Sequence, residues 1–211
     1  MKTLATLSLF VAAVAAFPLL ASAENLYVIL RGGPGFTPDV KVGAPSDQDD
    51  LGFGTGFTGG AALGYAFPFG LRAEGEFGFI YAPVESDNGI DIDGSYKNYL
   101  LMANAYYDFK FFGPIKPYVG FGLGAAFVHE DREVFADGLG RFLDVDESRT
   151  DFAYQARVGI AYEVNNWLDL SLGYRFVHID GATEGRGSNN FVIKHNSFIN
   201  HSVELGVAFK F

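Results

Sequence analysis

An uncharged run of 21 residues, positions 51–71, limits what this chain can fold into. The run is long enough to cross a lipid bilayer as a helix. It nevertheless contains seven glycines and Pro68, and each glycine inside a helix costs about 1 kcal/mol relative to alanine. Large residues such as Phe53, Phe57 and Leu63 stand at odd positions and most glycines at even ones, which predicts a β-strand with two different faces.

The same period of two recurs along the chain. We identify eight segments in which large apolar residues alternate with small or charged ones: 25–36, 51–67, 71–82, 96–109, 116–129, 151–163, 167–178 and a last one that ends at Phe211. Only the first is ambiguous, because both of its faces carry apolar residues. Long polar connections (37–50, 83–95, 130–150 and 179–196) alternate with short ones. We therefore predict an all-β fold, an eight-stranded antiparallel up-and-down barrel without a free edge.

The glycines decide which face of this barrel points inward. On a solvated exterior they would only weaken the strands, whereas inside a narrow barrel they leave room for long polar side chains. We therefore predict a transmembrane β-barrel whose phenylalanines and leucines face lipid over a band about 27 Å tall. Aromatic residues at the short-turn end, among them Trp167 and Phe211, would lie at the membrane interface.

A polar network in the lumen is predicted from five charged residues that share the inward parity. These are Arg72, Glu74, Glu76, Arg157 and Arg175. The interior of an eight-stranded barrel is only wide enough for side chains, so we expect the five to form ion pairs that close the lumen. The alternative is a small-solute pore lined by the same charges.

Composition excludes several classes of protein. The absence of cysteine excludes a disulfide framework, a thiolate zinc site and a cysteine nucleophile. A net charge of -10 argues against a nucleic-acid partner, which would need a basic surface. The acidity lies in three long connections, 37–51, 82–95 and 129–151, whose net charges are -3, -4 and -5. We predict that these acidic loops are extracellular and available to an external ligand.

The first 23 residues have the pattern of a secretory signal peptide. Lys2 precedes an apolar run over 4–20, and Ala21, Ser22 and Ala23 form a small-x-small cleavage motif. We predict cleavage before Glu24, so that residues 24–211 form one barrel domain of an exported protein.

Three segments resemble the eight-stranded outer-membrane β-barrel superfamily of Gram-negative bacteria. They are 117–124 (PYVGFGLG), 173–176 (GYRF) and the ending 201–211 (HSVELGVAFKF). The superfamily includes the OmpA transmembrane domain, the opacity-related surface antigens and other members of the porin family. The resemblance implies a location in the cell outer membrane, among outer-membrane lipid and lipopolysaccharide, and a structural and surface-interaction role as antigen or adhesin. It also implies that Val207, Phe209 and Phe211 form an assembly signal for the barrel-assembly machinery.

An enzymatic role is the second alternative. His195 and Ser197 stand two positions apart and resemble the His-x-Ser pair of outer-membrane lipid A deacylases, but no acid stands at a matching position. We therefore assign no catalytic residue and expect no enzyme activity. Segment 89–94 lacks the first and last ligands of an EF-hand. The other histidines lie on different strands: His129, His178 and His201. No metal site or cofactor is predicted.

Overall fold

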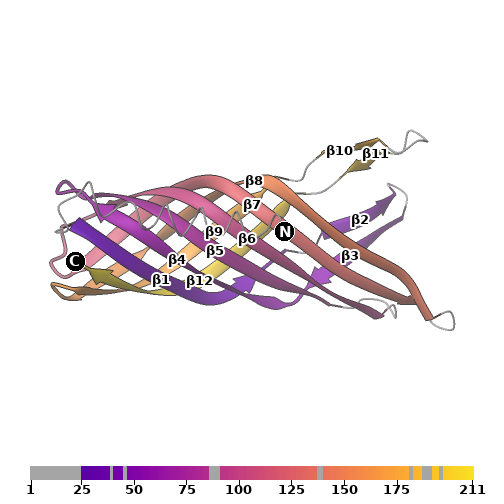
Figure 1. The fold of residues 1–211 in the computed structure, drawn as a ribbon. Helices are drawn as coiled ribbons and strands as arrows, with labels where there is room; N and C mark the ends of the chain where they lie inside the picture. The colour runs from indigo at the N-terminus through magenta and orange to yellow at the C-terminus, as the bar shows by residue number, and fades with distance from the viewer. Residues whose placement is uncertain are drawn as a thin grey trace.

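The computed structural model of the protein describes residues 25–38, 40–44, 47–85, 91–136, 140–180, 183–186, 192–194 and 197–211. Nearly all of these residues lie in β-strands, which form an elongated closed barrel (Figure 1). No helix in these ranges has the length and apolar character needed to cross a membrane. The predicted signal peptide and His195 lie outside the described residues.

Eight strands build the barrel and follow one another around it in chain order. They are β1 (Leu26–Phe36), β4 (Thr55–Ala66), β5 (Leu71–Glu85), β6 (Asp91–Asp108), β7 (Ile115–Ala136), β8 (Gly140–Asn165), β9 (Leu168–Ile179) and β12 (Phe198–Lys210). Each strand pairs antiparallel with the next, and β12 pairs with β1 to close the ring. The predicted eight-stranded up-and-down barrel is therefore confirmed.

Side chains alternate between the outer wall and the lumen along the barrel strands. On β12, Val203 and Leu205 are exposed, whereas Ser202 and Glu204 are buried. The same alternation holds on β7, where large apolar residues face out. The apolar face is thus the outer one, as the glycine pattern predicts, and the barrel presents to its surroundings a wall suited to lipid.

The inward glycines make room mainly for tyrosine rings. A Cβ atom at Gly64 would overlap the ring of Tyr27, and one at Gly120 would overlap the ring of Tyr106. Tyr118 lies against two further glycines in the same way. The lumen is only wide enough for side chains. Three large rings fit into it because the positions that face them are glycines, which have no side chain.

The prediction of four long loops is wrong in part, because much of their length continues as paired strand. β7 and β8 stay paired as far as Ala136 and Gly140, so most of 130–150 is a hairpin. Segment 37–50 contains most of the hairpin of β2 (Val40–Ala44) and β3 (Asp47–Phe53), and 179–196 contains β10 (Thr183–Arg186) and β11 (Val192–Lys194). Outside a bilayer both faces of a hairpin meet water, so the apolar alternation ends although the backbone pairing does not.

The opposite end of the barrel is closed by short turns and holds the C-terminus (Figure 1). Gly70 and Gly113 have φ of 93° and 63° there, a backbone conformation that side chains disfavour. Exposed aromatic residues surround this end, and the Trp167 ring stacks on Phe209 with centroids 6.4 Å apart. The rim therefore has a girdle of aromatic rings, as is typical of a membrane interface.

Candidate functional site in the barrel lumen

Glu74 is the centre of a first cluster of charges, near the short-turn end of the lumen. Its carboxylate accepts hydrogen bonds from Arg31 at 2.8 and 2.9 Å, from Arg72 at 2.9 Å and from the Tyr27 hydroxyl at 2.6 Å. Arg72 Nε also donates to Asp108 at 2.8 Å. The two arginines and two carboxylates of this cluster have no net charge, which lowers the cost of burying them.

Glu76 and Glu204 hold a second cluster, deeper in the barrel. Arg157 donates to both oxygens of Glu76, at 2.6 and 2.8 Å, and its Nε donates to Glu204 at 3.1 Å. Arg175 Nη1 donates to Glu204 at 3.3 Å, and its Nη2 lies 3.5 Å from Glu76. All four side chains are at most 4% exposed. Two arginines and two glutamates thus form a neutral, buried ring of ion pairs.

Neutral polar side chains complete the second cluster and join it to the first. Gln155 donates to Glu76 at 3.1 Å and accepts from Arg175 Nε at 2.7 Å. The Tyr106 hydroxyl accepts from Arg157 at 2.7 Å, while the Arg72 guanidinium lies over the Tyr106 ring, 4.7 Å from its centroid. The ring of Tyr106 is therefore shared between the two clusters, and the network continues through it.

The structure brings all five residues of the predicted network into these two clusters. Sequence reasoning missed Arg31, Asp108 and Glu204. Glu204 stands at the inward parity of its strand, but Arg31 lies in the first strand, where the parity is ambiguous. A charge count gives a signal for a further inward carboxylate such as Glu204 or Asp108: three arginines and two glutamates leave one positive charge unpaired, and an unpaired buried charge is costly.

An apolar layer occupies the lumen on the other side of the second cluster, toward the long hairpins. On β5 and β9 its members follow Glu76 and Arg175 along the strand. Its buried side chains come from six strands: Ile80, Ala82, Tyr96, Leu100, Met102, Ala126, Val128, Ala153, Val177, Ile179 and Phe198. Asn98 and Asn200 are buried at the same end with polar atoms that have no protein partner, a pattern that single ordered waters satisfy. An ion would lose most of its hydration shell in such a layer.

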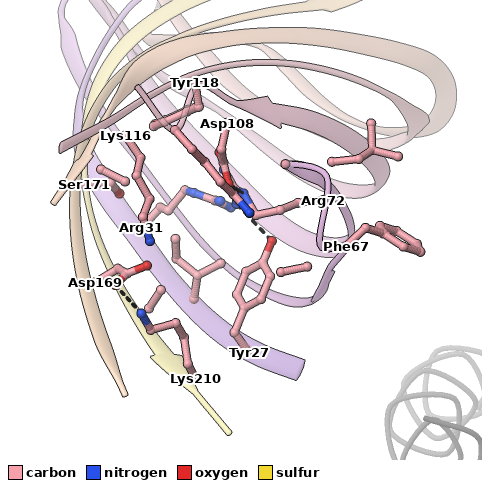
Figure 2. A pocket seen from close by; sticks show the side chains of 17 residues that line it. Tyr27, Arg31, Phe67, Arg72, Asp108, Lys116, Tyr118, Asp169, Ser171 and Lys210 are labelled. Carbon is pink, nitrogen blue, oxygen red and sulfur yellow. Dashed lines mark hydrogen bonds and ion pairs between the residues drawn. The ribbon is translucent and has the colours of Figure 1, made fainter. Parts of the chain in front are cut away.

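A cavity of about 120 Å³ opens at the short-turn end of the lumen (Figure 2). Arg31 and Arg72 of the first cluster line it, and near its mouth Lys210 Nζ lies 2.7 Å from Asp169. Lys116 forms an ion pair with Glu163 at the same end. The cavity is lined by the first cluster and by none of the four charges of the second, so it is a vestibule below the network.

The metal site and the hydrolase pair considered in the sequence analysis can be compared with the described residues only. In the described part of the chain, no group of three or more His, Cys, Asp or Glu side chains is arranged to hold a metal ion. Ser197 is exposed, and its expected companion His195 lies outside the described residues.

The predicted assembly-signal residues lie on or beside the outward face of β12. Phe209 and Phe211 are 39% and 66% exposed, and Val207 faces outward between Leu205 and Phe209. The Phe211 backbone N–H donates to the Leu26 carbonyl at 2.9 Å. The end of the chain is thus fixed at the seam where β12 meets β1.

Comparisons with known proteins agree with this architecture. The family described as "Outer membrane protein beta-barrel domain" matches residues 4–211. The chain is 24% identical over 189 residues to outer membrane protein PagN of Salmonella typhimurium, which covers 78% of the chain and 79% of PagN. It is 30% identical over 130 residues to a candidate adhesin of Rickettsia conorii. The aligned region covers 57% of this chain and 52% of the adhesin.

Among solved structures, Neisserial surface protein A has the same fold. It superposes with a TM-score of 0.53 at 23% sequence identity, covering 90% of this chain and 100% of that one. The family match covers far more than half of the chain. The protein therefore belongs to the outer membrane protein β-barrel domain family and resides in the cell outer membrane.

Proposed function

We propose that the protein is a closed outer-membrane barrel whose projecting hairpins interact with external ligands, as a surface antigen or adhesive element. The observation that carries this proposal is the length of β7 and β8. They contain 22 and 26 residues, whereas about 9–11 residues suffice for a tilted strand to cross a bilayer. The excess length forms a paired hairpin that runs past the other barrel strands on the side opposite the C-terminus (Figure 1).

Charge supports a role for this side of the barrel in recognition. The segments 82–95 and 129–151 carry net charges of -4 and -5, so they favour a partner with a basic surface. The relative in Rickettsia conorii is named as a candidate adhesin. In this proposal the barrel anchors the protein in the membrane, and the hairpin binds the partner.

The contents of the lumen support a structural barrel over a small-solute pore. Two neutral ion-pair clusters and an apolar layer lie in series along the lumen. Solute transport needs a continuous hydrated path, and buried ion pairs joined by several hydrogen bonds oppose its formation. We infer that the network closes the lumen and stabilises the wall.

Shortening the β7–β8 hairpin tests the proposal. Glu130 and Glu147 are directly paired, so an Asn-Gly turn can replace residues 131–146 and join them as a two-residue hairpin. We expect the shortened protein to assemble as a heat-modifiable barrel but to lose attachment to cultured epithelial cells. A matched control keeps the full hairpin length and replaces Asp144 and Asp146 with asparagine, which isolates the contribution of charge. Full attachment by the shortened barrel would overturn the proposal.

A further inference from the structure

The vestibule at the short-turn end of the lumen owes its space to small inward residues on β4, β8, β9 and β12. They are Ala66, Ala161, Ser171 and Ala208, and all of them line the cavity of about 120 Å³ (Figure 2). An engineered protein cavity of about 150 Å³ holds one benzene molecule. By that comparison the vestibule holds a compact molecule of up to about six non-hydrogen atoms.

Two hydroxyl groups of the vestibule wall have no hydrogen-bond partner among the described residues. They belong to Tyr118 and Ser171. A Cβ atom at Gly173 would lie 2.4 Å from the Tyr118 hydroxyl oxygen, and one at Gly206 would lie 2.3 Å from Ser171 Oγ and 3.4 Å from Arg31 Cγ. Ser171 and Gly173 stand two positions apart on β9, and Gly206 pairs with Ser171 across β12. The two free hydroxyls and the Arg31 side chain are therefore neighbours on one side of the cavity.

The charges around the vestibule leave one positive charge in excess. The cations that line it are Arg31, Arg72, Lys110, Lys116 and Lys210. The carboxylates that pair with them are Glu74, Asp108, Glu163 and Asp169. Within the described part of the chain, the Lys110 ammonium donates to the Pro68 carbonyl oxygen at 3.1 Å and to no carboxylate. An excess cation beside a partly enclosed cavity favours the entry of a single anion.

We propose that the vestibule binds a short-chain organic monocarboxylate. The carboxylate would accept hydrogen bonds from the Tyr118 and Ser171 hydroxyls, and Lys110 supplies the charge that attracts the anion to the cavity. The alkyl chain would lie against the apolar part of the lining, where Ile29 and Ala208 are found. A dianion would exceed the single excess charge, and a much larger molecule would exceed the cavity. This inference is independent of the adhesive role.

Titration of the purified full-length barrel in a non-ionic detergent, followed by saturation-transfer NMR, tests the site. The probes are butyrate and butyramide, which have the same size but differ in charge. We expect wild-type protein to bind butyrate about tenfold more tightly, because hydrogen bonds to a charged group are the stronger ones. Ala161→Leu fills the cavity and should weaken butyrate binding at least about tenfold. Lys110→Gln should weaken it about fivefold, and Lys110→Arg should restore it.

Ala156→Leu is the matched control for the filled cavity, because Ala156 is an exposed residue of the same strand, β8. This variant should bind butyrate as wild type does. Heat-modifiable migration of every variant shows that the barrel is folded. Equal binding of butyrate and butyramide by wild-type protein would overturn the proposed site. Undiminished butyrate binding by a folded Ala161→Leu or Lys110→Gln variant would overturn it as well.

Discussion

At the scale of single residues, the lumen is organised around carboxylates that have several donors each. Glu76 accepts from both terminal nitrogens of Arg157 and also from Asn104 and Gln155. Strand parity predicts which charged residues point inward, but it does not predict which of them pair with each other. Which strands face one another across the lumen depends on the stagger of the barrel, and Glu74 meets Arg31 only because β1 and β5 approach in that register.

Replacing Glu76 with alanine should destabilise the barrel strongly. Arg157 and Arg175 would then share Glu204 alone, so one buried positive charge would lose its counter-charge, which typically costs about 3–5 kcal/mol in the free energy of unfolding. Urea titration followed by heat-modifiable migration measures the change. Leu172→Ala is the control, because Leu172 is 47% exposed on the outer wall and should change stability far less. If the Glu76→Ala variant retains full stability and has a changed ion selectivity, the lumen is hydrated. The small-solute pore is then the better hypothesis.

Two glycines provide a matched test of the lumen packing. A Cβ at Gly120 would overlap the Tyr106 ring, whereas one at Gly75, on the outer face, has no atom within 4 Å. Gly120→Ala should therefore lower the free energy of unfolding by about 1–3 kcal/mol. Gly75→Ala should leave it unchanged or slightly raise it. Equal urea midpoints for the two variants would show that Tyr106 has room to move aside.

At the scale of elements, the sequence predicts the membrane-crossing strands well and their extensions poorly. The alternation on β7 ends near His129 because lipid no longer selects the outward residues, yet pairing continues to Ala136. Apolar periodicity reports burial and contact with lipid, whereas backbone hydrogen bonding is independent of side-chain polarity. The first strand is ambiguous in the sequence for a related reason: Tyr27 and Ile29 face a partly apolar lumen.

The orientation of the strands is testable with single cysteines, because the chain has none of its own. Ser197 is exposed on the hairpin side and Asn166 in the turn between β8 and β9. A membrane-impermeant maleimide should label Ser197→Cys in intact cells and Asn166→Cys only after permeabilisation of the outer membrane. The reverse labelling pattern would show that the barrel has the opposite orientation in the membrane.

At the scale of the whole molecule, closure depends on the seam between the first and last strands. Phe211 contributes there through its backbone hydrogen bond to Leu26 and an exposed ring at the aromatic rim. Phe211→Asp should leave unassembled protein in the periplasm, because a charge replaces the outward ring and the proposed assembly signal is lost. Cell fractionation with heat-modifiability measures this outcome. A normal yield of folded Phe211→Asp barrel in the membrane would remove Phe211 from that signal.

We propose that the molecule as a whole is a membrane anchor with a closed lumen, in which two neutral ion-pair clusters and an apolar layer lie between the vestibule at the short-turn end and the hairpins. Single-channel recording of the purified barrel in a planar lipid bilayer tests this claim most directly. We predict a quiet baseline without reproducible open steps for the wild-type protein, because an ion would have to cross both buried layers. Reproducible unitary conductance steps at neutral pH would contradict it.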